Sequence, residues 1–193
     1  MPRGARIEGA GLIHHVTGHS HRTVDAFPDE PSLLGFLSLL ADTALRLRWQ
    51  VLAYCLLSTH YHLLARTDEP NLGEGMRHVH GRHAQRLNAR HSSSGPVWRD
   101  RFHSKPVRDG RHVVRAAVYV DMNPVAAGVC DNPSEWRWSS YRANVGLSKA
   151  PRWHRVDLLH AHLGASPDEA AEIYRDVVAT TLAVERARRE ASA

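Results

Sequence analysis

Two histidines one residue apart, His60 and His62, open an apolar run of the sequence and could together hold a metal ion. Successive side chains of a β-strand point to opposite faces, so both imidazoles would share one face and Tyr61 would take the other. The spacing alone is weak evidence for a metal site, because this chain with 15 histidines repeats the spacing elsewhere, starting at His19, His78 and His160. The expected central position of the strand is more informative, since a buried polar pair needs a partner or a ligand.

A third metal ligand is expected from a helix over residues 109–123. Spacings of three and four residues place four of its polar side chains on one stripe, namely His112, Arg115, Tyr119 and Asn123. Asn123 could give a carbonyl oxygen to a metal, and Tyr119, one turn earlier, could place its phenol oxygen beside it. Taken alone, however, Tyr119 fits a packed aromatic residue with a hydrogen-bonded hydroxyl better than it fits a nucleophile.

The elements that must position these groups follow from hydrophobic periodicity and from helix and turn signals. Strands are expected over residues 12–17, 51–57, 60–66 and 97–107, and the middle two form a hairpin. Helices are expected over 32–48, 72–90 and 109–123, with Asp29, Asn71 and Asp109 as start signals and Pro124 as a stop. This order predicts an α+β protein with a ferredoxin-like antiparallel sheet (β-α-β-β-α-β), an added helix that carries the tyrosine, and a helical C-terminal tail.

The length of 193 residues suits one domain with a tail, and we expect a first unit over 1–145 and a helical extension over 146–193. Within the extension, residues 167–190 read as a charged, alanine-rich helix. No apolar run approaches a membrane span, and the N-terminus lacks the apolar segment of a signal peptide, so a cytoplasmic protein is expected. Cys55 reads as a buried thiol.

The basic residues favour a polyanionic partner, with a net charge of +5, a pI near 9.7 and 23 arginines. A genomic base composition that favours Arg and Ala codons would explain the same numbers. The candidates for DNA binding are Arg82, Arg86, Arg99, Arg101, His103, Lys105, Arg108 and Arg115, each of which could equally belong to a solvated basic face. Trp98 could stack on a base, whereas Phe102 fits a core position better.

Four separated segments together resemble one protein family: "CLLSTHYHLLA", "VWRDRFHSKPV", "AAVYVDMNPVAAGV" and "WRWSSY". In this order they are similar to the single-tyrosine HUH transposases of bacterial insertion sequences, in particular to the REP-associated tyrosine transposases. The resemblance covers roughly residues 10–145. The chain departs from the family at Leu57-Ser58-Thr59, where Met-Pro-Asn is common, and after the first strand, where "TGHSHR" replaces an Arg-Gly segment.

The resemblance implies cleavage and rejoining of single-stranded DNA in transposition, through a 5′-phosphotyrosine intermediate. It implies Tyr119 as the nucleophile, and His60, His62 and Asn123 as ligands of Mg or Mn, although imidazole ligands by themselves suit Zn, Ni or Cu better. The implied partner is a DNA hairpin or palindrome at the nucleoid, bound by a monomer or a homodimer.

Two other readings remain open on the sequence. The chain could be a domesticated, non-catalytic regulator that binds DNA hairpins with the same fold, or a metal-dependent hydrolase that forms no covalent adduct. An additional carboxylate on the metal face would favour the hydrolase, but Asp121 points away from the Tyr119 stripe. The aromatic cluster Trp136, Trp138 and Tyr141 reads as packing that closes the domain.

Overall fold

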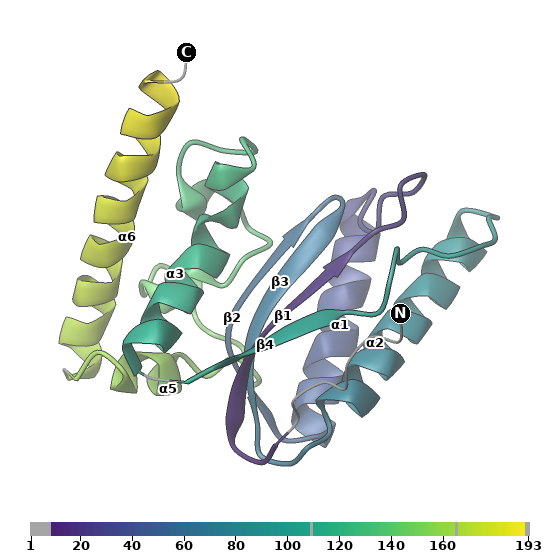
Figure 1. The fold of residues 1–193 in the computed structure, drawn as a ribbon, viewed down its shortest axis with the longest axis horizontal. Coiled ribbons are helices and arrows are strands. Elements are labelled where there is room, and N and C mark those ends of the chain that lie inside the picture. The colour runs from purple at the N-terminus through teal and green to yellow at the C-terminus, as the bar shows by residue number, and fades with distance from the viewer. Residues whose placement is uncertain (1–8, 109, 165, 192–193) are drawn as a thin grey trace.

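A four-stranded sheet with helices on both faces forms the centre of the computed structural model, which describes residues 9–108, 110–164 and 166–191 (Figure 1). The strands are β1 (Leu12–His19), β2 (Trp49–Leu57), β3 (His60–Thr67) and β4 (His103–Val107). Their order is β2-β3-β1-β4, and each neighbouring pair is antiparallel. The predicted ferredoxin-like fold is therefore confirmed.

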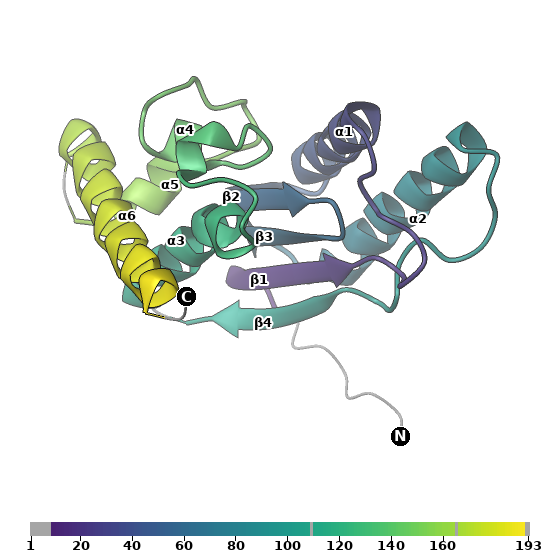
Figure 2. The same cartoon turned by 90° about the horizontal axis from the view of Figure 1, so that it is seen from above.

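The helices form two layers that sandwich the sheet (Figure 2). One face is covered by α1 (Glu30–Arg46) and α2 (Leu72–Arg90). The other face carries α3 (Gly110–Ala126), with α4 (Tyr141–Asn144), α5 (Val156–Ala161) and α6 (Pro167–Glu190) around it. No helix in the described part of the chain is both long and apolar enough to cross a membrane.

The alternation of side chains along β3 assigns its residues to two separate cores. Tyr61 and Leu63 pack with α1 and α2, whereas Leu64 belongs to the core that includes α3. His60 and His62 have the parity of Leu64, so their imidazoles face α3. The predicted helix over 109–123 therefore lies on the same face of the sheet as the histidine pair.

The predicted strand over 97–107 is too long at its start, since only His103–Val107 is a strand. Trp98 bridges Ser20, and His103 pairs with Thr17. Between these two contacts the chain advances five residues from Trp98 to His103 but only three from Thr17 to Ser20, so the residues between Trp98 and His103 must loop out of the ladder.

The prediction that Pro124 ends its helix is also wrong, because α3 continues to Ala126. The helix is terminated instead by Gly128, two residues beyond its last residue, which has a φ of 71°. There the amide of Val129 donates to the carbonyl of Pro124 and the amide of Gly128 to that of Val125, both at 2.9 Å. This is a Schellman ending, which satisfies the last carbonyls. The start signal Asp109 lies outside the described residues.

A buried carboxylate, Asp121, ties α3 to the C-terminal half of the chain. Its oxygens accept hydrogen bonds from Ser140 Oγ at 2.6 Å, Asn144 Nδ2 at 2.9 Å and the hydroxyl of Tyr174 at 2.8 Å. Burial raises the pKa of Asp121 to about 6, against the lowering effect of these three donors. Residues of α6, including Tyr174 and Val178, belong to the same core as α3, so the predicted C-terminal extension packs onto the sheet domain.

We expect Tyr174→Phe to lower the free energy of unfolding by about 1–3 kcal/mol, because it removes one donor from a fully buried carboxylate. Urea unfolding followed by circular dichroism measures this loss. Tyr54→Phe is the matched control, since the Tyr54 hydroxyl has no hydrogen-bond partner among the described residues. Equal stability of the two variants would contradict a role for the Tyr174 hydroxyl in fixing α6.

Acid should destabilise the protein partly through His154, whose Nε2 donates to the carbonyl of Leu52 at 3.2 Å. Burial lowers the pKa of His154 to about 4 in the folded state, below the value near 6.5 of the unfolded chain. The unfolded state therefore binds more protons between these values, and stability falls as the pH drops from 7 towards 4. The contribution reaches about 2 kcal/mol at pH 5.

His154→Asn retains a donor and cannot titrate, so this variant should lose about 2 kcal/mol less than the wild type between pH 7.5 and pH 5. Urea unfolding at the two pH values measures the difference. Asp121 acts in the opposite direction, because its raised pKa favours the folded state at low pH, but it is present in both proteins. Parallel pH profiles would show that His154 does not remain neutral in the folded state.

Candidate active site

A cavity of about 360 Å³ brings the predicted catalytic residues together between the sheet and α3. β3 contributes His60 and His62, and α3 contributes Tyr119 and Asn123. The remaining wall comes from β1 and β4, with His15, Thr17, His19, His103, Ser104 and Lys105. Residues from four elements, which are far apart in the sequence, therefore meet in one space.

The nucleophile and ligand predicted on α3 lie one turn apart at this cavity. Tyr119 is 56% exposed and Asn123 is buried. The amide nitrogen Nδ2 of Asn123 donates to the carbonyl oxygen of Tyr119 at 2.7 Å, which fixes the orientation of the Asn123 side chain. The Tyr119 ring stands edge-to-face against His62, with centroids 5.5 Å apart. More than half of Tyr119 is exposed and its hydroxyl has no hydrogen-bond partner among the described residues, so the interpretation as a packed aromatic residue with a hydrogen-bonded hydroxyl is wrong.

His15 on β1 is a site residue that the sequence did not identify. Its Nε2 lies 3.0 Å from Nδ1 of His62, and the two rings are stacked with centroids 5.2 Å apart. His14, its neighbour in the sequence, is fully buried. The doublet in "LIHHVT" was a usable signal, but only the pairing of β1 with β3 decides which of the two histidines reaches His62.

Four of the histidines that line the cavity, His15, His19, His60 and His62, have lowered pKa values, which favours their neutral form. Burial, followed by the nearby His15, His60 and His19, lowers the pKa of His62 to about 3. The pKa values of His15, His19 and His60 are also lowered, in each case mainly by burial. Neutral imidazoles retain the lone pair that metal coordination requires.

Each of the three predicted ligands has one donor atom without a hydrogen-bond partner among the described residues. Nδ1 of His62 contacts His15, and Nδ1 of His60 lies 3.0 Å from Thr59 Oγ1, so each ring keeps its Nε2 for another partner. Asn123 uses its nitrogen, which leaves its Oδ1. Among the described residues, no group of three or more His, Cys, Asp or Glu side chains is arranged for a metal, so the set depends on the Asn123 oxygen.

The structure brings only part of the predicted DNA-binding set to this cavity. His103 and Lys105 line it, and the charge of Arg99 contributes to the lowered pKa of His19. Arg115 is exposed on α3 and lines the neighbouring groove beside Tyr119. The other members are also exposed but lie elsewhere, with Arg108 at the end of β4, Arg101 before its start, and Arg82 and Arg86 on α2.

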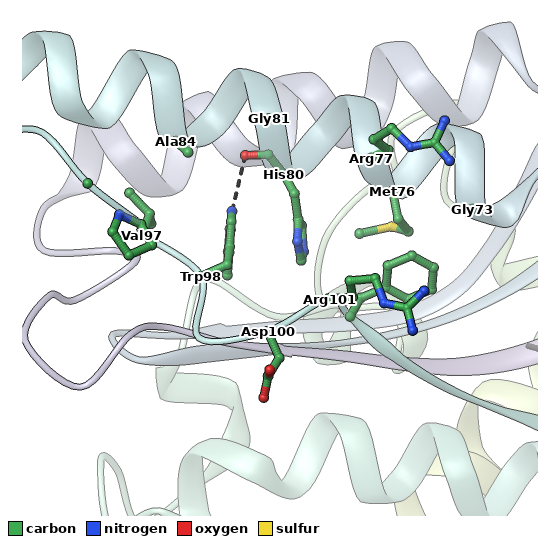
Figure 3. A pocket seen from close by; sticks show the side chains of 13 residues that line it. Gly73, Met76, Arg77, His80, Gly81, Ala84, Val97, Trp98, Asp100 and Arg101 are labelled. Atoms are coloured by element: carbon green, nitrogen blue, oxygen red, sulfur yellow. Dashed lines mark hydrogen bonds between the residues drawn. The ribbon is translucent and has the colours of Figure 1, made fainter. Parts of the chain in front are cut away.

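Arg101 borders a different pocket, of about 450 Å³, between α2 and the segment that precedes β4 (Figure 3). There Trp98 stacks on His80 with ring centroids 4.0 Å apart and donates from Nε1 to the His80 carbonyl at 3.1 Å. One face of the indole is thus already covered. Phe102 is buried, as expected for a core residue.

The aromatic cluster after α3 is packing, as predicted. Trp138 and Tyr141 are buried, and Trp136 donates from Nε1 to the carbonyl of Leu56 at 2.8 Å. Burial raises the pKa of Tyr141, which is the opposite of what a nucleophile needs.

Comparison with solved structures places the chain in a known fold. A REP-associated tyrosine transposase, solved in complex with a REP hairpin, superposes with a TM-score of 0.67 at 16% identity, over 78% of this chain and 89% of that chain. A candidate transposase from Deinococcus radiodurans gives 0.42 at 17% identity, over 56% and 88%. No family model and no curated protein matches the sequence.

The chain therefore has the fold of the REP-associated tyrosine transposases, which is the fold that its four sequence motifs predict. The prediction of a four-stranded antiparallel sheet flanked by helices is confirmed by the same superposition.

We expect His62 to carry its ring proton on Nδ1, because this nitrogen faces His15 and the other faces the cavity. Two-dimensional NMR of the imidazole nitrogens at pH 7 distinguishes the two tautomers. His15→Ala should shift His62 towards the Nε2-protonated form, whereas His21→Ala, in the exposed loop beyond β1, should leave its spectrum unchanged. An unaltered tautomer in His15→Ala would mean that His15 does not orient His62.

Proposed function

We propose that the protein cleaves and rejoins single-stranded DNA during transposition through a covalent link to Tyr119. The observation that carries this proposal is the meeting of an accessible Tyr119 with His60, His62 and Asn123 in one cavity. Three facts support it together: the neutral imidazoles, the free donor atoms and the fold shared with a tyrosine transposase. The regulator reading has no observation of its own in its favour.

In the proposed reaction the Tyr119 hydroxyl oxygen attacks a backbone phosphorus. The bond from phosphorus to the 3′-oxygen breaks, and that oxygen leaves as a hydroxyl with the proton that the phenol gives up. The product is a 5′-phosphotyrosine, and attack by another 3′-hydroxyl reverses the step and joins new ends. The phosphodiester energy is conserved, so no nucleotide cofactor is required.

A divalent cation bound by Nε2 of His60, Nε2 of His62 and Oδ1 of Asn123 would polarise the phosphate and stabilise the charge that develops on it. The family resemblance points to Mg or Mn. His15 orients the His62 ring so that Nε2 stays available, which is the usual role of a residue behind a metal ligand.

The charges around the cavity fit a phosphate backbone. Lys105 lines the cavity, and Arg115 extends the positive surface along α3 beside Tyr119. The similar solved transposase was bound to a REP hairpin, so we propose a hairpin or palindromic single strand as the partner of this chain as well. A protein that acts on chromosomal DNA in this way would work in the cytoplasm, at the nucleoid.

A denaturing gel tests the proposal. The protein is incubated with single-stranded DNA of the palindromes that flank its gene, with Mg, with Mn or with a chelator. We expect a protein–DNA adduct that needs the metal and that disappears in Tyr119→Phe, a loss of at least about 10³-fold for removal of a nucleophile. Tyr141→Phe is the matched control and should form the adduct normally, because this tyrosine is buried.

The outcomes distinguish the covalent mechanism from the two other hypotheses, a hydrolase and a non-catalytic regulator. Cleavage that persists in Tyr119→Phe and gives no adduct would identify a hydrolase. Tight binding of the hairpin with no adduct under either metal would identify a non-catalytic regulator.

A further inference from the structure

A second cavity, of about 410 Å³, lies between α3 and α6 and shares Tyr119 with the candidate active site. Its walls are mainly apolar, with Val118 and Met122 from α3 and Val177 from α6. Its polar lining consists of Arg115, Thr181, Glu185 and Arg188, and Oε1 of Glu185 lies 4.0 Å from Nε of Arg189. We refer to this cavity as the α3–α6 groove; Figure 2 shows the two helices beside each other.

Two hydrogen bonds between α3 and α6 fix the positions of the two walls of the groove relative to each other. The hydroxyl of Tyr174 on α6 donates to Asp121 on α3, in the core beneath the groove. At the far end of α6, the guanidinium of Arg189 donates to the carbonyl of Val125. The walls are therefore attached to each other at two places, and an occupant would enter a space that is already formed.

Tyr119 stands at the boundary between the two cavities. The edge-to-face contacts with His15 and His62, at centroid distances of 5.6 Å and 5.5 Å, lie on the active-site side of its ring. A DNA strand with a phosphate at the Tyr119 hydroxyl must continue past this residue in both directions. One of the flanking nucleotides then lies beside an apolar groove.

The chemistry of the groove fits a nucleotide whose base is unpaired. Apolar side chains favour the faces of a base, and the exposed guanidinium of Arg115 can pair with a neighbouring phosphate. A base in a duplex could not enter, because its neighbours and its pairing partner would hold it in the stack.

We propose that the α3–α6 groove binds the unpaired base of a nucleotide that flanks the phosphate attacked by Tyr119. This inference rests on the proposed function and adds a substrate subsite to it. The C-terminal helix α6 then forms one wall of the DNA-binding site.

The experiment compares two substitutions on one helix. Val177 and Val184 are both exposed residues of α6, at 37% and 49%, but only Val177 lines the groove. Affinity for a 5′-labelled single strand of the flanking palindrome is measured by fluorescence anisotropy in the presence of a chelator. A second set of strands carries one abasic site at each nucleotide next to the cleaved phosphate.

We expect Val177→Trp to weaken binding of the intact strand by about tenfold and Val184→Trp to leave it unchanged, since a base in such a site contributes about that factor. An abasic site at one flanking position should weaken wild-type binding by about the same factor. On that abasic strand Val177→Trp should have less than about a twofold further effect, because no base remains to be displaced.

The proposal would be overturned if Val177→Trp bound both the intact and the abasic strand as tightly as the wild type does. It would also be overturned if this variant lost the same factor of affinity on both strands. If the tryptophan variant does not fold, Ala126→Leu on the opposite wall repeats the test, with the adjacent Ala127→Leu as its control. Because binding is measured without metal, the result is independent of cleavage. Base-dependent binding without any adduct in the wild type would retain the groove and reject the covalent mechanism.

Discussion

The strand β3 is paired along both edges and packed on both faces, and this constraint determines the position of the candidate site. A shift of one residue would move His62 to the side of α1 and α2 and Tyr61 to the side of α3. Tyr61 prevents such a shift, because its buried hydroxyl lies 2.7 Å from Nε2 of His80. Gly18, opposite Tyr61 on β1, provides the room for the ring, since a Cβ there would lie 2.4 Å from Tyr61 Cε1. The core on one face of the sheet thus fixes the histidine pair on the other.

The helix α3 has two polar sides with separate roles. Tyr119 and Asn123 face the histidines, whereas Asp121, between them in the sequence, points into the core and is held by donors from α4, its N-terminal flank and α6. A buried carboxylate with three donors has one favourable orientation, so it limits rotation of the helix about its axis. The position of the Tyr119 ring is therefore controlled from the opposite side of the helix.

Much of the site could be predicted because strand and helix periodicity are local properties. The parity of His60 and His62 and the spacing of Tyr119 and Asn123 needed no knowledge of the fold. His15 could not be selected over His14, because the choice depends on the register between two strands that are distant in the sequence. The continuation of α3 past Pro124 was also missed, since the burial of Val125 and the ending at Gly128 outweigh the lost hydrogen bond.

The hydrogen bond between Asp121 and Tyr174 has a consequence for folding during synthesis on the ribosome. The helix that bears Tyr119 ends at Ala126, but Tyr174 follows 48 residues later in the chain. At a synthesis rate of about 5–20 residues per second, roughly 2–10 s pass before it is added. Until then one donor to Asp121 and one wall of the α3–α6 groove are missing. Assembly around Tyr119 is thus completed only after α6 has been synthesised, and until then a ribosome-bound chain holds this tyrosine on a helix that is not yet fully fixed.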